Sequence, residues 1–362
     1  MKRFPILRPH SGFTLIELLI AIAVSGIVLA GLVQVFTTSN RSYSLQDEMA
    51  TQQQNLRVAK TYLERDIRMA GCGFGSAFFY LGTQIYPLEN TNAVSGSPSD
   101  PPSGPIAGSD ILTISYVNYS DLSSGSLPQL TPTSLAPSPS PTTFTVSTNS
   151  DVSLWESGPH ELPFLAVYTR PVSFGSTNLI SDVFTVTGVD SANRTLTCTG
   201  LRTDISTTNI SQSSSINFFS AAQLNTIRFE LRFEVTPIDP LNPKPMLYRT
   251  DNDGIIREIA ENIEDLQFAF GLDSNSDGIV ENNEWFGDGI IDGGDEQDLD
   301  DNQKTQIRLV RISILGKSSR QLPGQKEIVR PDIEDHAVGT VTPEKYLRQL
   351  IQFEIKPRNL KG

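Results

Sequence analysis

Histidine is scarce in this chain, and the three residues present lie far apart, at positions 10, 160 and 336. The sequence also lacks a nucleophile elbow, a phosphate-binding loop and the ligand spacings of a zinc site. Recognised arrangements of catalytic residues are therefore missing, and we predict that the protein is not an enzyme.

Basic residues are also few, and they are distributed unevenly. The formal net charge is −13, and the isoelectric point is about 4.7. Residues 261–303 contain 14 acidic side chains and no lysine or arginine, so the rest of the chain is nearly neutral. Because no basic patch is interleaved with aromatic residues, we expect no nucleic-acid partner. The local excess of acids indicates a cation-binding region instead.

Acidic residues are absent from the first twelve positions, which carry Lys2, Arg3 and Arg8. Residues 13–36 then form an apolar run of 24 residues, which as a helix is about 36 Å long and sufficient to span a bilayer. The one ionisable side chain in this run is Glu17. A carboxylate in a membrane costs roughly 2.5–3.5 kcal/mol at the bilayer centre and less near an end, so this acid requires a partner.

The junction Gly12-Phe13, followed by Glu17 in an unbroken apolar context, resembles the type IV prepilin signal. The resemblance implies that a prepilin peptidase removes residues 1–12 by cutting between Gly12 and Phe13, and that Phe13 becomes N-methylated. It also implies that Glu17 pairs with the free N-terminal amine of a neighbouring subunit during assembly. A secretory signal differs, because its small-residue cleavage site follows its apolar stretch. The alternative is a simple signal anchor in which Glu17 is incidental.

The distribution of charge predicts the topology. By the positive-inside bias, the basic leader places the N-terminus in the cytoplasm and everything after residue 36 on the other side of the inner membrane. The resemblance implies a periplasmic head that later reaches the pilus at the cell surface. Cys72 and Cys198 are the two cysteines of the chain. Both lie in this oxidising compartment, so we predict a disulfide between them.

A second helical pattern follows the apolar run without a break. Residues 37–71 are polar, lack proline, and contain no glycine before Gly71, which is placed to end the helix. We predict an amphipathic stalk helix that continues the transmembrane helix and packs its outer half on a globular head. Its apolar face consists of Met49, Leu56, Ala59, Leu63, Ile67 and Ala70.

Beyond the stalk, residues 72–362 are predicted to form a large β-rich head. The Ser- and Pro-rich composition of residues 88–150 indicates loop or linker, with a surface excursion at 135–141 and one strand at 111–117. β-Branched and aromatic runs indicate further strands at 162–169, 183–189, 194–201, 227–235, 246–249, 263–272, 307–315 and 347–355. A long helix followed by mainly antiparallel strands is an α+β fold, of the type IV pilin-like kind that the resemblance implies.

The segment Leu63-Glu64-Arg65-Asp66-Ile67-Arg68-Met69-Ala70-Gly71 is similar to the PilW family of minor pilins. The strand at 307–315 and the C-terminal residues 357–359 fit that family as well. The similarity implies a low-abundance component that helps to start or cap a pilus together with other minor and major pilins. In major pilins a segment of the membrane helix unwinds between a glycine and a proline. This chain has the glycine, Gly26, but carries Gln34 at about the position of the proline, so the sequence does not predict whether its helix unwinds.

Residues 273–284 have the pattern of a twelve-residue calcium-binding loop. Calcium takes six to eight oxygen ligands, and Gly278 allows the sharp turn at the sixth position. The expected ligands are Asp273, Asn275, Asp277, the backbone carbonyl of Ile279, Glu281 and Glu284. Val280 is expected to point to the core. The flanking sequences are not helical, so we predict an isolated calcium site at a sheet edge, within an acidic region that extends to residue 303.

Two further acidic stretches allow more than one interpretation. One group of aspartates either completes the calcium site or forms a second one, although a solvated loop explains it better. This group is Asp288, Asp292, Asp295, Asp298, Asp300 and Asp301. Asp251-Asn252-Asp253-Gly254 has a fragment of the calcium pattern, but a tight turn between two strands accounts for it better.

Three functions fit these features. The first is a structural or assembly role as a minor pilin with a calcium-stabilised head. The second is a J-type pseudopilin of a type II secretion system, which shares the signal and the Leu-Glu-Arg-Asp helix. The third is a calcium-dependent adhesive module at a filament tip. Neighbouring genes discriminate between the first two, and binding of the head to a surface or glycan identifies the third.

Overall fold

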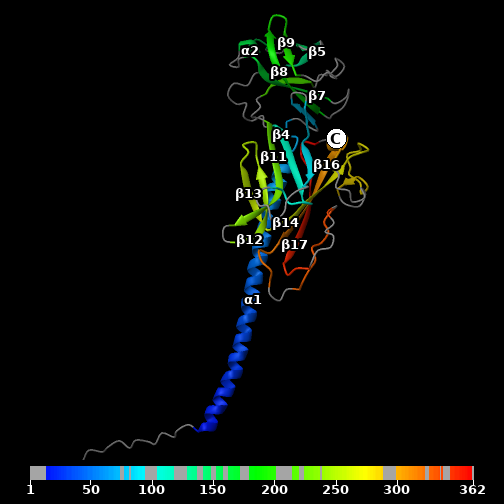
Figure 1. The fold of residues 1–362 in the computed structure, drawn as a ribbon. Helices are drawn as coiled ribbons and strands as arrows, with labels where there is room; N and C mark the ends of the chain where they lie inside the picture. Colours follow the sequence, from blue (N-terminus) through cyan, green and yellow to red (C-terminus); the bar gives the residue numbers. More distant parts are fainter. Residues whose placement is uncertain are drawn as a thin grey trace, which may run out of the picture.

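The computed structural model places the parts of the chain along one line (Figure 1). A long helix, α1, leads into a β-rich base module, and a second β-rich module, the distal module, lies beyond it at the end farthest from the start of the helix. The described residues are 14–73, 77–80, 83–93, 104–117, 129–136, 142–147, 152–157, 162–171, 179–200, 214–219, 224–236, 239–287, 299–322, 326–334, 336 and 343–360.

Helix α1 runs without interruption over Leu15–Ile67, which is 53 residues. Thr14 caps its N-terminus, and after Arg68 the chain turns, with the N–H groups of Met69 and Ala70 bonded to carbonyls three residues back. Gly71 then adopts a φ of 68°, a left-handed conformation that favours glycine. The single long helix is confirmed, and it ends before Ala70 because its last turn is not α-helical.

The base module contains two antiparallel sheets. The five-stranded sheet has the order β13 (Ile256–Glu261), β12 (Asp239–Thr250), β11 (Leu224–Thr236), β4 (Asp110–Val117) and β3 (Leu88–Asn92). The four-stranded sheet has the order β15 (Trp285–Phe286), β14 (Ile263–Leu272), β16 (Ile307–Lys317) and β17 (Arg348–Ile355). A short helix, α3 (Asp301–Gln306), leads into β16.

One hydrophobic core joins α1 to both sheets of the base module. From the helix and the turn after it come Leu56, Ala59, Leu63, Ile67 and Ala70. The sheets contribute residues such as Phe229 of β11 and Ile312 of β16. A Cβ on Gly316 would lie 3.1 Å from Leu56, so β16 passes directly under the helix. Burying a leucine side chain is worth about 1.5–3 kcal/mol, so these contacts are enough to hold the outer half of α1 on the base module.

The buried face of α1 differs from the predicted one at its N-terminal end. Met49 is 41% exposed, whereas Glu48 and Gln52 are buried. The two polar residues continue the buried face toward Leu56 at a spacing of four residues, and Met49 lies about 100° away around the helix. The predicted seven-residue repeat is therefore wrong at Met49, because polar side chains face the base module there.

The distal module is an eight-stranded sheet with its own core. Its main order is β10 (Ser215–Phe218), β7 (Phe164–Pro171), β8 (Leu179–Asp190), β9 (Thr195–Thr199), β6 (Thr142–Val146) and β5 (Pro132–Ala136). β1 (Ala77–Tyr80) pairs in parallel with β8 and antiparallel with β2 (Thr83–Ile85). The short helix α2 (Val152–Ser157) places Trp155 in a core that includes Phe144 and Phe184.

Most of the distal module is inserted between two neighbouring strands of the base module, whereas its strands β1 and β2 come from the chain between α1 and β3. β4 ends at Val117, β11 begins at Leu224, and these two residues are paired across the ladder. All of β5 to β10 comes from the chain between them. A small apolar cluster that includes Phe78, Val167 and Phe219 joins Val117 where the modules meet. The distal module thus extends from the end of a β-hairpin.

The predicted α+β fold is confirmed, and each predicted strand has a counterpart, with the same ends at 263–272 and shifted ends elsewhere. The prediction of loop for residues 88–150 is wrong in part, because β3, β5 and β6 lie there besides β4. Leu135, which was placed in a surface excursion, is 2% exposed, and Phe144 is fully buried. These short strands send alternate side chains into the core and depend on pairing with neighbours, which composition alone does not reveal.

Candidate functional site

The start of α1 carries the predicted assembly residue, Glu17. Its carboxylate accepts hydrogen bonds from the Thr14 N–H and the Thr14 hydroxyl, both at 2.9 Å, and the Glu17 N–H donates to the Thr14 hydroxyl at 3.3 Å. This reciprocal capping box satisfies donors that a helix N-terminus otherwise leaves unpaired. In a single chain, Glu17 therefore caps its own helix. Gly12 and Phe13, the predicted processing residues, lie outside the described residues.

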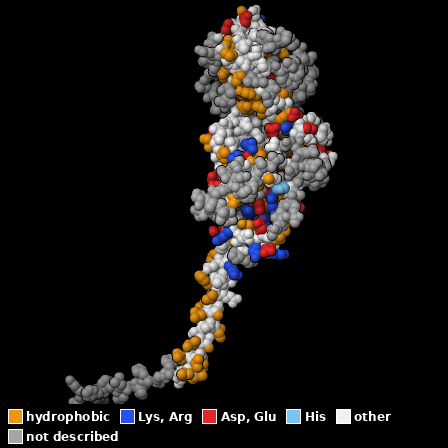
Figure 2. All heavy atoms as spheres, in the orientation of Figure 1, with side chains coloured by type: hydrophobic (Ala, Val, Ile, Leu, Met, Phe, Trp, Pro, Cys, Tyr) orange, Lys and Arg blue, Asp and Glu red, His pale blue; other side chains and the backbone are white. Residues whose placement is uncertain are grey.

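The N-terminal part of α1 exposes its apolar side chains on all sides. An 18-residue window has a mean hydropathy of 2.6, and none of it is buried within the molecule. Leu15 is 78% exposed and Ile27 is 75% exposed. Hydrophobic side chains line this part of the helix below the head (Figure 2). By length and composition the helix is able to cross a membrane, and an apolar surface of this extent requires lipid or other apolar helices around it.

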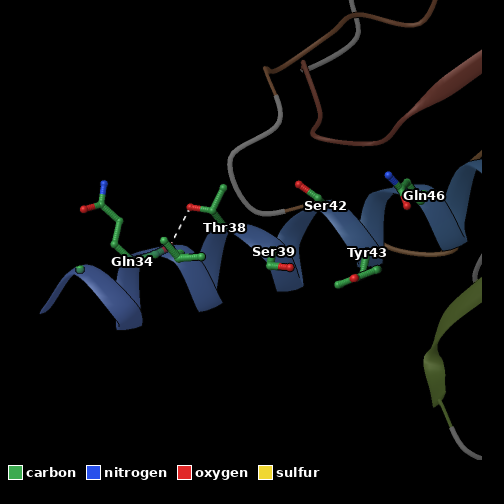
Figure 3. A pocket seen from close by; sticks show the side chains of 8 residues that line it. Gln34, Thr38, Ser39, Ser42, Tyr43 and Gln46 are labelled. Carbon is green, nitrogen blue, oxygen red and sulfur yellow. Dashed lines mark hydrogen bonds between the residues drawn. The ribbon is translucent and has the colours of Figure 1, made fainter. Parts of the chain in front are cut away.

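An open groove runs along α1 between its apolar part and the base module (Figure 3). It is lined by Gly31, Gln34, Val35, Thr38, Ser39, Ser42, Tyr43 and Gln46. The hydroxyls of Thr37 and Thr38 both donate to the Gln34 carbonyl, at 3.0 and 2.9 Å. Such bonds compete with the helical amide for the same oxygen and favour bending of a helix. The lining residues offer hydroxyl and amide groups beside the apolar side chain of Val35 and the ring of Tyr43, and none of them is charged.

Polar side chains fasten to α1 the end of the base module that lies nearest the apolar part of the helix. The buried carboxylate of Glu48 accepts hydrogen bonds from the N–H of Ser319 at 2.9 Å and from its hydroxyl at 2.8 Å, and Arg320 lies 3.3 Å away. Gln52 donates to the Gly316 carbonyl at 2.7 Å. We call these contacts the stalk latch. Because buried polar groups are stable only when they are paired, the latch fixes where the base module sits on the stalk.

The last turn of α1 is held by a buried acid, Asp66. Its carboxylate accepts a hydrogen bond from Arg249 of β12 at 2.7 Å. Arg249 and Arg257 both pair with Asp251, in a turn closed by a bond of 2.9 Å from the Gly254 N–H to the Asp251 carbonyl. Arginines therefore engage the Asp251 carboxylate, and the interpretation of residues 251–254 as a tight turn between two strands is confirmed.

The predicted calcium loop, residues 273–284, connects β14 to β15. The Gly278 N–H lies 3.3 Å from both carboxylate oxygens of Asp273, and Gly278 adopts a φ of 82°. The Glu284 carboxylate reaches back across the loop and accepts hydrogen bonds from the N–H groups of Ser274 and Glu281, at 3.1 and 3.0 Å. Asp273 and Glu284 are buried, whereas residues 274–279 are exposed. The first and last residues thus close the loop.

Electrostatics and packing hold this loop in place. Hydrogen bonds from the Glu281 N–H and the Ser274 hydroxyl lower the pKa of Glu284 below its ordinary value, so its carboxylate stays charged. A Cβ on Gly271 would lie 2.7 Å from Val280, which shows that Val280 rests against β14. The predicted inward direction of Val280 agrees with this contact.

The loop offers oxygen ligands that calcium accepts, but its carboxylates do not converge. Among the described residues, no group of three or more His, Cys, Asp or Glu side chains lies close enough together to hold a metal ion. Asp273 faces Arg308 at 3.4 Å, and Asn275 and Asp277 accept hydrogen bonds from backbone N–H groups of the loop. To coordinate calcium, Asn275 and Asp277 therefore have to give up their hydrogen bonds to backbone N–H groups. Asp273 has to move away from Arg308 toward the ion.

Of the aspartates between residues 288 and 301, the two that the structure describes belong to the start of helix α3. Asp300 caps α3, because its carboxylate accepts a hydrogen bond of 2.7 Å from the Gln303 N–H, and Asp301 lies in the first turn of that helix. Acidic side chains are favourable at this end of a helix. Asp288, Asp292, Asp295 and Asp298 lie outside the described residues.

The predicted disulfide is absent. Both cysteines are among the described residues, and no bond joins them. Cys72 is half-buried in the turn after α1, whereas Cys198 is buried on β9 in the core of the distal module. Burial raises the pKa of the Cys198 thiol to about 12. The prediction is corrected because the two cysteines belong to different modules, which compartment and cysteine number do not reveal.

His336 belongs to a polar cluster that lies on β14. Its Nδ1 lies 3.1 Å from the buried carboxylate of Asp265 and 3.0 Å from Arg330. Its ring rests on Gly108, where a Cβ would lie 2.5 Å from Nε2. These contacts hold the chain around residues 330–336 against the sheet, which is a structural role. His10 and His160 lie outside the described residues.

Two known families match this chain, one in its N-terminal region and one in its C-terminal region. Residues 7–33 match the family described as the prokaryotic N-terminal methylation motif, and residues 241–359 match the family described as type IV pilus-assembly protein W, PilW. No curated protein and no solved structure matches the chain. The first match covers Glu17 and most of the apolar part of α1, and the second covers most of β12 and all of β13 to β17 of the base module. The chain is therefore similar to type IV pilins in its N-terminal signal and similar to PilW in its C-terminal region.

Proposed function

We propose that the protein is a minor pilin that acts at the start or the tip of a type IV pilus. The observation that carries the proposal is that α1 consists of two parts with different surroundings. Its apolar part is uncovered on all sides, while its outer part is built into the core of a large head. Such a helix needs lipid around it before assembly and apolar helices of other subunits afterwards. The matches to the methylation motif and to PilW support the same role.

In this proposal, α1 anchors the chain in the inner membrane with the leader in the cytoplasm and the head in the periplasm. Prepilin peptidase cuts between Gly12 and Phe13, and Phe13 becomes N-methylated. Glu17 then exchanges its contacts with Thr14 for the N-terminal amine of a neighbouring subunit. Mass spectrometry of the mature N-terminus tests the processing step. An intact leader in cells with active peptidase would contradict it.

Gene deletion with complementation tests the role itself. We expect fewer surface pili in the deletion strain, recovery with the wild-type gene, and co-purification of the chain with sheared pili. Loss of type II secretion with normal pili would assign the chain to a pseudopilus instead. Normal pili with lost attachment would favour the adhesive module, a second candidate that the exposed position of the distal module supports (Figure 1).

We also propose that calcium bound at residues 273–284 stabilises the head. Asp273, Asn275, Asp277, the Ile279 carbonyl, Glu281 and Glu284 are the groups that would hold it. The order of these oxygen donors, the closure of the loop by Asp273 and Glu284, and the anchoring of Val280 on β14 support the proposal. The Asp273–Arg308 contact opposes it, because binding has to release that pair.

A further inference from the structure

The distal module lies beyond the base module on the continuation of α1, at the end opposite the apolar part of the helix (Figure 1). It adds nothing to the core that holds α1. The residues around Leu56 and Leu63 pack with the two sheets of the base module, and Trp155 and Phe184 belong to a separate core. A complete pilin-like unit of one helix and a β head is therefore present without the distal module.

The place of insertion supports this separation. Val117 and Leu224 are paired residues of adjacent antiparallel strands, so a two-residue turn is able to join them directly. Residues 118–223 thus replace what would otherwise be a short hairpin loop at the far end of the base module. Neither family match includes this segment.

In a filament of parallel subunits, the end of the base module farthest from the apolar part of α1 faces the next subunit outward. Head-to-tail contacts generate open helical assemblies in which each internal subunit has neighbours on both sides along the axis. If the α1 helices lie side by side, the next subunit outward places its head beyond the far end of the one before. In this chain the distal module lies beyond that end (Figure 1).

We propose that the distal module, which consists of residues 118–223 together with β1 and β2, confines this chain to the outer end of the filament and thereby limits its copy number. The module blocks the position of a further subunit outward, and it leaves the membrane side of the base module open to subunits that follow. This inference rests on the proposed function, because it assumes that the chain enters a pilus.

The test replaces residues 118–223 by Asn-Gly, so that Val117 and Leu224 are joined through a tight turn, while β1 and β2 stay in the chain and keep their pairing with each other. A control variant carries an unrelated compact domain of similar size between the same two residues. Pili are sheared from cells that express each variant, the copies of the chain per pilus are quantified by mass spectrometry, and an epitope at the C-terminus is labelled with gold for microscopy.

We expect the wild-type chain and the control at one end of each pilus, and the shortened chain along the shaft in several-fold higher copy number. Label along the shaft for the wild-type chain would overturn the inference whether or not the shortened chain folds. A shortened chain that inserts, resists proteolysis and still labels only the end would overturn it as well. Absence of the wild-type chain from pili would instead contradict the proposed function.

Discussion

Three acids of α1 lie in different surroundings, and each is expected to respond differently to substitution. Glu17 caps the exposed start of the helix through Thr14. Glu48 is buried against Ser319, and Asp66 is buried against Arg249. Removing a buried acceptor leaves its donors unsatisfied, whereas removing an exposed one leaves them to water.

Glu17→Val is expected to insert into the membrane at least as well as the wild-type chain and to be lost from purified pili. Valine removes an acid that is unfavourable in lipid and also removes the charge that would meet a neighbour's amine. Glu17→Gln is the matched control, because its amide oxygen retains the bonds from Thr14 without the charge. We expect the Gln variant to be lost as well. Incorporation of both variants at wild-type levels, by immunoblot of sheared pili, would show that the charge is dispensable.

Glu48→Ala is expected to lower the free energy of unfolding by about 1–3 kcal/mol, because the Ser319 N–H loses its buried acceptor. Asp47→Ala changes a neighbouring exposed acid and is expected to stay within about 0.5 kcal/mol of the wild type. Denaturant unfolding of the full chain in detergent measures both. A change of less than about 0.5 kcal/mol for Glu48→Ala, as for the control, would show that the Glu48 contacts contribute no stability.

Two structural elements carry the next predictions: the 273–284 loop is expected to bind calcium, and β9 is expected to protect Cys198 from reagents. The loop is closed by hydrogen bonds between its own residues and is anchored on β14 at Val280. Cys198 lies on β9, between β6 and β8, with its thiol in an apolar core. The loop is open to a ligand on its exposed side, and the strand is closed to reagents.

Calcium in the millimolar range is expected to raise the melting temperature of the chain by several degrees relative to chelator. A ligand at a hundredfold excess over its dissociation constant stabilises by about 2.7 kcal/mol, and extracellular sites of this kind bind at roughly 0.1–1 mM. Glu284→Gln should abolish the shift, and Asn283→Ala, at an exposed non-ligand position, should keep it. Magnesium should substitute poorly because it prefers a tighter octahedral shell. Equal melting temperatures with calcium and chelator would refute the site.

The two thiols are expected to react at different rates and to remain unlinked. A maleimide should label half-buried Cys72 in the native chain and Cys198 only after unfolding, because burial raises the pKa of Cys198 to about 12 and excludes the reagent. Peptide mapping under non-reducing conditions measures the linkage. A peptide pair joined through both cysteines in exported protein would contradict the structure.

For the molecule as a whole, the main feature is that two β-rich modules have separate cores and meet at the end of the β4–β11 hairpin and at β1 and β2. The small cluster around Phe78 and Val117 is the apolar contact where they meet. Each module is larger than this contact, so local unfolding of one module leaves most of the other intact.

Calorimetry of the full chain is therefore expected to show two unfolding transitions, of which calcium shifts one. The shifted transition should be that of the base module, which contains the 273–284 loop. The variant with Asn-Gly in place of residues 118–223 identifies the other transition by losing it. A single transition that moves as a unit with calcium would show that the two modules unfold cooperatively.

The sequence by itself determined the features that depend on local order. The prepilin-type signal is a short motif, and α1 and the strand at β11 follow from periodic apolar residues, which reflect burial on one face of a helix or strand. The turn at residues 251–254 was also predictable, because its residues favour a tight turn between two strands. These features need no knowledge of which distant segments meet.

The tertiary structure alone decided the features that depend on long-range contacts. Val117 and Leu224 are neighbours in space although a whole module separates them along the chain, and this pairing places the insertion at the far end. The same dependence explains why Cys72 and Cys198 lie in different modules, why Glu48 is buried in place of Met49, and why Asp273 meets Arg308. A side chain's partner is set by the segment that packs against it, and residue spacing does not encode that choice.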